Sequence, residues 1–77
     1  MGNMSDSLRL VSLSIGQDNF EELLIRLPDE FFGLSAERKE LVWNSLLSDV
    51  NQGIEDAKDL ANLAAKYVGI LLESTFG

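Results

Sequence analysis

Residues 49–53 read Asp-Val-Asn-Gln-Gly, and this short stretch decides how the second half of the chain folds. Asn and Asp favour turns over helix interiors, and Gly costs about 1 kcal/mol relative to Ala inside a helix. Acidic residues follow at positions 55, 56 and 59, as is typical of a first helical turn. The composition therefore favours a break near 51–53, between a helix over 36–51 and a helix over 54–75.

An apolar seven-residue repeat runs through the same stretch without interruption, and it predicts an alternative. A repeat of this kind is typical of a helix whose apolar face packs on other helices. An unbroken helix would span about 40 residues and about 60 Å at 1.5 Å per residue. It could not bury its own apolar face in a chain of 77 residues and would require a homodimer. The repeat consists of Trp43, Val50, Ala57, Ala64 and Leu71, with Leu47, Ile54, Ala61, Val68 and Thr75 four residues behind.

Towards the N-terminus, residues 18–28 carry the signals of a shorter helix. Asp18 is expected to cap this helix, with Glu21 three residues later completing a capping box. Apolar residues at positions 20, 23, 24 and 27 recur at helical spacing. Because the residue before a proline avoids helical geometry, Pro28 is expected to end the helix, which should cover 19–27.

Two adjacent phenylalanines occupy the turn expected over residues 29–33. Phe31 and Phe32 cannot easily both face one core, so one is expected to fill the end of a helical bundle. The other is expected to cover a helix or to contact a partner, because aromatic side chains often anchor interfaces. Ser35 is then expected to cap the helix over 36–51.

Residues 8–15, Leu-Arg-Leu-Val-Ser-Leu-Ser-Ile, form the one strand-like stretch of the sequence. Val11, Leu13 and Ile15 alternate with serines, which is the period of a half-buried strand. Such a strand would need another subunit or the sheet edge of a partner to pair with. The alternative is an extended arm or a first helical turn packed on the bundle. Residues 1–7 are small and polar and are expected to be disordered, leaving 8–77 as a single helical domain.

The composition excludes several classes of chemistry. Thirteen acidic and six basic residues give a formal charge of −7, and His and Cys are absent. Disulfides, thiolate nucleophiles, Cys/His zinc sites and histidine bases are therefore excluded, and we expect no enzyme activity, metal or cofactor. Without a Lys/Arg excess, direct nucleic-acid binding is disfavoured. The most apolar stretch, 60–72, falls short of the roughly 20 residues that span a membrane. We expect a cytoplasmic protein with no membrane contact.

These observations predict an all-α fold, a small three-helix bundle with an N-terminal arm or strand. The predicted function is a non-enzymatic protein-binding module, a small acidic regulator, inhibitor or chaperone that acts through an apolar helix face. One alternative is an acidic nucleic-acid mimic that blocks a DNA-binding protein, and another is a self-assembling structural subunit. The expected partner is a protein, a second copy of the chain, or both. The predicted interface consists of Val11, Leu13, Ile15, Phe31, Phe32, Trp43, Leu47, Val50, Ile54, Ala57, Ala61, Ala64, Val68 and Leu71.

Overall fold

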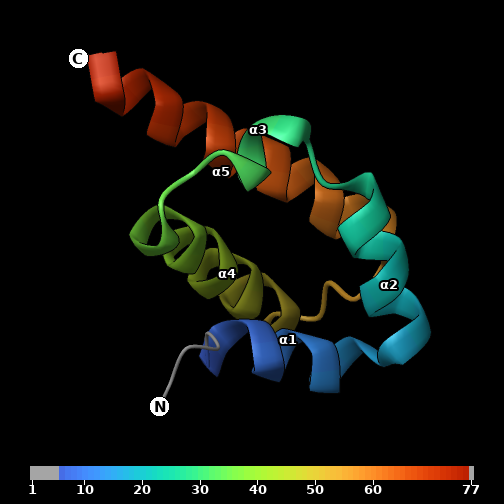
Figure 1. Cartoon of the computed structure of the whole chain (residues 1–77). Coiled ribbons are helices and arrows are strands. Elements are labelled where there is room, and N and C mark those ends of the chain that lie inside the picture. The colour runs from blue at the N-terminus through green and yellow to red at the C-terminus, as the bar shows by residue number, and fades with distance from the viewer. Residues whose placement is uncertain (1–5, 77) are drawn as a thin grey trace.

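The computed structural model describes residues 6–76, with the side chains of 74–76 left out of the description. This part of the chain is all-α and contains no strand (Figure 1). The predicted fold class is confirmed, but the described residues form five helices where three were expected. The helices are α1 (Asp6–Ile15), α2 (Gln17–Arg26), α3 (Asp29–Phe32), α4 (Ala36–Asn51) and α5 (Ala57–Phe76).

The four longer helices form a ring around the core (Figure 1). Helix α4 packs against α1 on one side and α5 on the other. Helix α2 completes the ring by packing against both α1 and α5. The short helix α3 packs on α5. Helices α2 and α4 therefore face each other across the interior, and side chains from both fill the space between them.

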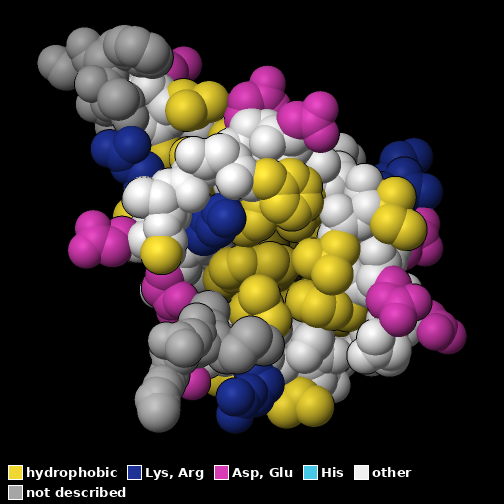
Figure 2. Space-filling view, viewed as in Figure 1, with side chains coloured by type: hydrophobic (Ala, Val, Ile, Leu, Met, Phe, Trp, Pro, Cys, Tyr) yellow, Lys and Arg dark blue, Asp and Glu magenta, His cyan; other side chains and the backbone are white. Residues whose placement is uncertain are grey.

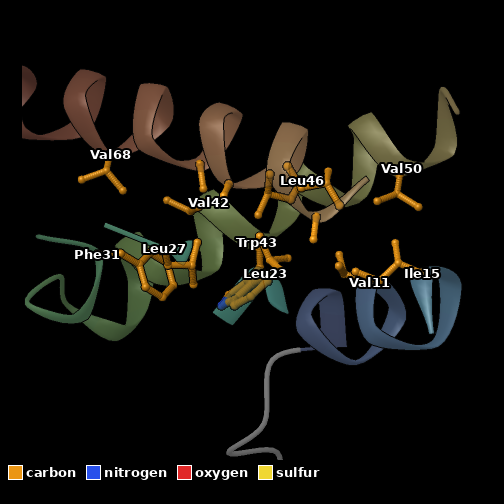
Figure 3. Packing of buried hydrophobic residues seen from close by; sticks show 14 of the residues in the cluster. Val11, Ile15, Leu23, Leu27, Phe31, Val42, Trp43, Leu46, Val50 and Val68 are labelled. Atoms are coloured by element: carbon orange, nitrogen blue, oxygen red, sulfur yellow. The ribbon is translucent and has the colours of Figure 1, made fainter. Parts of the chain in front are cut away.

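The buried core consists of aliphatic side chains together with the rings of Phe31 and Trp43 (Figure 3), and the half-buried Phe20 packs against it. The ring centroid of Trp43 lies 5.9 Å from that of Phe20 on α2 and 5.6 Å from that of Phe31 on α3. These contacts connect α4 across the core to α2 and to α3. Burying a valine, leucine or phenylalanine side chain stabilises the fold by about 1.5–3 kcal/mol. The fully buried large side chains are Leu23, Leu46, Leu60, Val11 and Val42.

The predicted break after residue 51 is confirmed, and the continuous 40-residue helix is wrong. Gly53 adopts φ of 108°, a left-handed conformation that glycine reaches without steric cost. Its N–H donates to the carbonyl of Val50 at 2.9 Å, and the N–H of Ile54 donates to the carbonyl of Asp49 at 3.1 Å. This pair of bonds is a Schellman motif, which satisfies carbonyls that the end of a helix leaves unpaired. The apolar repeat continues past the break because both helices face the same core.

Of the two possibilities for residues 8–15, the strand is wrong, because this stretch is helical and belongs to α1. Ser7, Val11 and Ile15 follow one another at intervals of four and form the buried face of the helix. The Ser7 hydroxyl donates a hydrogen bond to Asn44 Oδ1 and so joins α1 to α4. Leu13 points outward and is 73% exposed, so the alternation of apolar residues was not a two-sided strand pattern. Of residues 1–7, which were expected to be disordered, 1–5 lie outside the described residues, whereas Asp6 and Ser7 form the start of α1, so the expectation is wrong for these two.

The helix expected over 19–27 is α2, and its predicted start is wrong. Gly16, at φ of 91°, occupies the N-cap position, so Asp18 lies inside the first turn and caps nothing. The predicted end is one residue too late, because α2 ends at Arg26 and Leu27 is extended ahead of Pro28, the effect for which Pro28 was expected to end the helix. Part of the turn expected over 29–33 is the short helix α3.

The start of α4 is confirmed and that of α5 is corrected. Ser35 Oγ accepts the N–H of Arg38 at 3.3 Å, as a capping serine does. Helix α5 begins at Ala57 instead of residue 54, since Asp56 bonds to a backbone N–H of its first turn as a capping residue does. The Asp56 carboxylate accepts the N–H of Lys58 at 2.9 Å.

Candidate functional site

Most residues of the predicted interface lie inside the core of the single chain. Nine of the fourteen are buried, three are half-buried and two are exposed. A buried side chain has no surface for a partner, so the nine stabilise the fold of the chain itself. The buried residues are Val11, Ile15, Phe31, Trp43, Val50, Ala57, Ala61, Ala64 and Val68; the half-buried ones are Leu47, Ile54 and Leu71; the exposed ones are Leu13 and Phe32.

Four exposed hydrophobic residues were missing from the predicted interface: Leu10, Ile25, Leu41 and Ile70. The exposure of Ile25 could have been predicted from its position in the sequence. Successive helical residues are about 100° apart, so Ile25 lies about 200° around α2 from the buried Leu23. Ile25 therefore points away from the core and is 83% exposed.

Leu41 and Ile70 line a shallow groove from two different helices, α4 and α5. Each is 52% exposed. The groove has a volume of about 120 Å³ and is mostly apolar. This volume is below the roughly 300–1,000 Å³ of small-molecule sites, so the groove is suited to an apolar side chain of a partner. The groove is lined by Leu41, Val42, Ser45, Tyr67, Ile70 and Leu71.

Tyr67 in the wall of the groove is held by the end of α4. Its hydroxyl donates a hydrogen bond of 2.6 Å to Asp49 Oδ2. This hydrogen bond, together with burial and the negative charge of Asp49, raises the pKa of Tyr67 to about 12. The phenol therefore stays protonated at neutral pH and serves to fix the two helices.

A second candidate surface is formed by exposed side chains of α2 and α3. We call Glu21, Ile25, Asp29, Glu30 and Phe32 the α2–α3 surface; all five are exposed. The ring of Phe32 packs edge-on against the buried ring of Phe31, with centroids 5.4 Å apart. The core therefore supports Phe32, although the residue itself is 53% exposed.

The negative charge of the chain is concentrated on the same two helices. Residues 17–32 carry five carboxylates and one guanidinium, which is a net charge of −4 out of −7. Helices α1 and α5 carry equal numbers of acidic and basic residues, and α4 has a net charge of −1. In Figure 2, hydrophobic side chains gather at the centre of the face shown, and both acidic and basic side chains lie around its edge, so the excess of negative charge on α2 and α3 is a matter of count and not of a separate acidic patch.

One ion pair occurs among residues 6–76. It uses Arg26, the single basic residue of the segment 17–32. Arg26 Nε lies 2.8 Å from Glu22 Oε2. The other carboxylates of α2 and α3 have no cationic partner in the described part of the chain. The four are Asp18, Glu21, Asp29 and Glu30.

Within the described residues, no three acidic side chains gather closely enough to hold a metal ion. None of the helices described is both long enough and apolar enough to cross a membrane. Comparisons with protein-family models, curated proteins and solved structures find no match to this chain. The candidate sites of the described chain are therefore the α4–α5 groove and the α2–α3 surface.

Proposed function

We propose that this chain is a non-enzymatic protein-binding module, a small acidic regulator, inhibitor or chaperone of the cytoplasm. The observation that supports this function is the exposure of Ile25 on a helix whose opposite face, at Leu23, is fully buried. An isoleucine in water contributes little to folding, whereas burial against a partner would gain about 1.5–3 kcal/mol. The α4–α5 groove adds a second apolar surface, because Leu41 and Ile70 are neighbours across it.

Site-specific photo-crosslinking tests this function and captures a partner of any identity. A photoreactive phenylalanine analogue is placed at position 25 or at position 41, and at exposed Asn62 on α5 as the matched control. We expect a discrete adduct with a different protein from position 25 or 41 and none from position 62. No adduct at either apolar position, or equal adducts at all three, contradicts the proposal.

The same experiment distinguishes a homodimer, the second candidate. The α4–α5 groove favours it, because α5 carries no net charge that would repel a second copy. An adduct of twice the 8.5 kDa chain mass from position 41 would support the self-assembling subunit. An adduct of any other mass would support a different partner.

A further inference from the structure

The α2–α3 surface combines Ile25, the most exposed large hydrophobic residue of the described chain, with three carboxylates, and it lies within the segment 17–32 that has a net charge of −4 out of −7. We propose that it docks a basic amphipathic helix of a different protein, with lysine or arginine beside leucine or isoleucine. The proposal rests on the protein-binding function proposed above, and it specifies the surface used and the charge of the partner.

Charge complementarity selects a basic partner. Glu21 and Glu22 precede Ile25 by one helical turn, and Asp18 lies one turn before Glu21. Arg26 neutralises Glu22, whereas Glu21 has no cationic partner. Like charges one turn apart destabilise a helix, and cations from a partner would remove that repulsion. The negative potential around Ile25 would also speed the approach of a basic helix and reject an acidic one.

The apolar residues supply the anchor for such a helix. Ile25 projects from α2 into solvent, and Phe32 is held in place by its edge-on contact with Phe31. A partner would therefore bury Phe32 without having to order it first, which reduces the entropic cost of binding. Lysine and arginine at the rim would contact the carboxylates while leucine or isoleucine covers Ile25.

A second copy of this chain does not match the α2–α3 surface. Its own α2–α3 segment carries the same net charge of −4, and its α1 and α5 helices are neutral. No helix of the described chain therefore provides the positive charge that this surface requires. The occupant is a different protein.

A labelled amphipathic helical peptide of lysine and leucine serves as the probe in fluorescence anisotropy with the full chain. A glutamate–leucine peptide of equal length is the control. We expect the lysine–leucine peptide to bind, with an affinity that falls as salt rises, because salt screens exposed charges. We expect no binding of the acidic peptide. Failure of the basic peptide to bind overturns this proposal, whereas the crosslinking experiment decides the general protein-binding function.

Two pairs of variants locate the binding surface. We expect Ile25→Ala to weaken peptide binding about fivefold or more, and Leu13→Ala on α1 to weaken it less than about twofold. The double variant Glu21→Gln/Glu30→Gln should weaken binding more than Glu37→Gln/Glu73→Gln, which changes the net charge equally at exposed sites on α4 and α5. Equal effects within either pair overturn the proposal. Thermal unfolding confirms that each variant is folded.

Discussion

The hydroxyl of Tyr67 on α5 donates a 2.6 Å hydrogen bond to Asp49 Oδ2 in the last turn of α4. The backbone carbonyl of Asp49 also accepts the N–H of Ile54, which lies just after the break. One residue therefore ends α4 and holds α5 beside it. A carboxylate near a helix C-terminus is electrostatically unfavourable, and the hydrogen bond from Tyr67 offsets part of that cost.

Replacing Tyr67 by phenylalanine should lower the free energy of unfolding by about 1 kcal/mol, through loss of this hydrogen bond. The measurement is urea unfolding followed by circular dichroism. The control is the same replacement in an Asp49→Ala background, where it should cost less because the acceptor is already absent. Equal costs in both backgrounds would show that the bond does not stabilise the fold.

The hydrogen bond also predicts how stability depends on alkaline pH. The pKa of Tyr67 is raised from 10.0 to about 12, so the folded chain holds the phenol proton more tightly than the unfolded chain does. The contribution of Tyr67 is therefore complete below pH 10 and is lost as pH rises towards 12. Between these values the native chain should lose more stability than Tyr67→Phe. Parallel stability curves would contradict this assignment.

Gly53→Ala should destabilise the fold by about 1–2 kcal/mol, because alanine is strained in a left-handed conformation. No neighbouring atom would contact the added methyl group at Gly53, so the cost arises from the backbone. Gly69→Ala is the matched control, since Gly69 lies inside α5 and also has open space around it. That variant should stabilise the chain by up to about 1 kcal/mol. The difference in melting temperature between the two variants checks the prediction.

Ala61→Leu should destabilise the fold by about 1–3 kcal/mol through overfilling of the core. Ala61 is buried, whereas Ala65 on the same helix is exposed and serves as the control position. Ala65→Leu should leave chemical unfolding nearly unchanged. If Ala61→Leu were equally harmless, the buried position of Ala61 on α5 would be wrong.

Val11 and Leu13 distinguish a helix from a strand at the N-terminus. In a strand their side chains would share one face, but in α1 Val11 is fully buried and Leu13 is 73% exposed. Val11→Ala should therefore cost about 2 kcal/mol of stability, and Leu13→Ala close to none. Similar losses for both variants in a denaturant titration would favour the strand.

Local signals in the sequence predicted much of the second half of the fold. Ser35 marked the start of α4, and the Asn-Gln-Gly stretch marked its end, because caps and left-handed turns depend on the residues present. The apolar repeat also identified side chains that are buried. It could not show whether another helix of the same chain or a second copy would cover them. A repeat identifies the apolar face of a helix but not the element that packs against that face.

The candidate surfaces were harder to predict. In residues 8–15, the apolar residues at positions 11, 13 and 15 fit a strand, and positions 11 and 15 also fit one face of a helix. Only the structure shows that Leu13 points away from the core. Ile25 lies beside the apolar positions 23, 24 and 27 in the sequence, so its place on the outer face of α2 was not predicted. The α4–α5 groove joins residues far apart in the sequence, so its existence depends on tertiary packing.

Whether the α2–α3 surface binds a basic partner is tested most directly by one ratio of affinities. The dissociation constant of the lysine–leucine peptide is measured for Ile25→Ala and for Leu13→Ala at the same salt concentration. We expect binding to be weaker in Ile25→Ala by about threefold or more, because one side chain lies in the interface and the other does not. A ratio of one would show that Ile25 lies outside the binding surface.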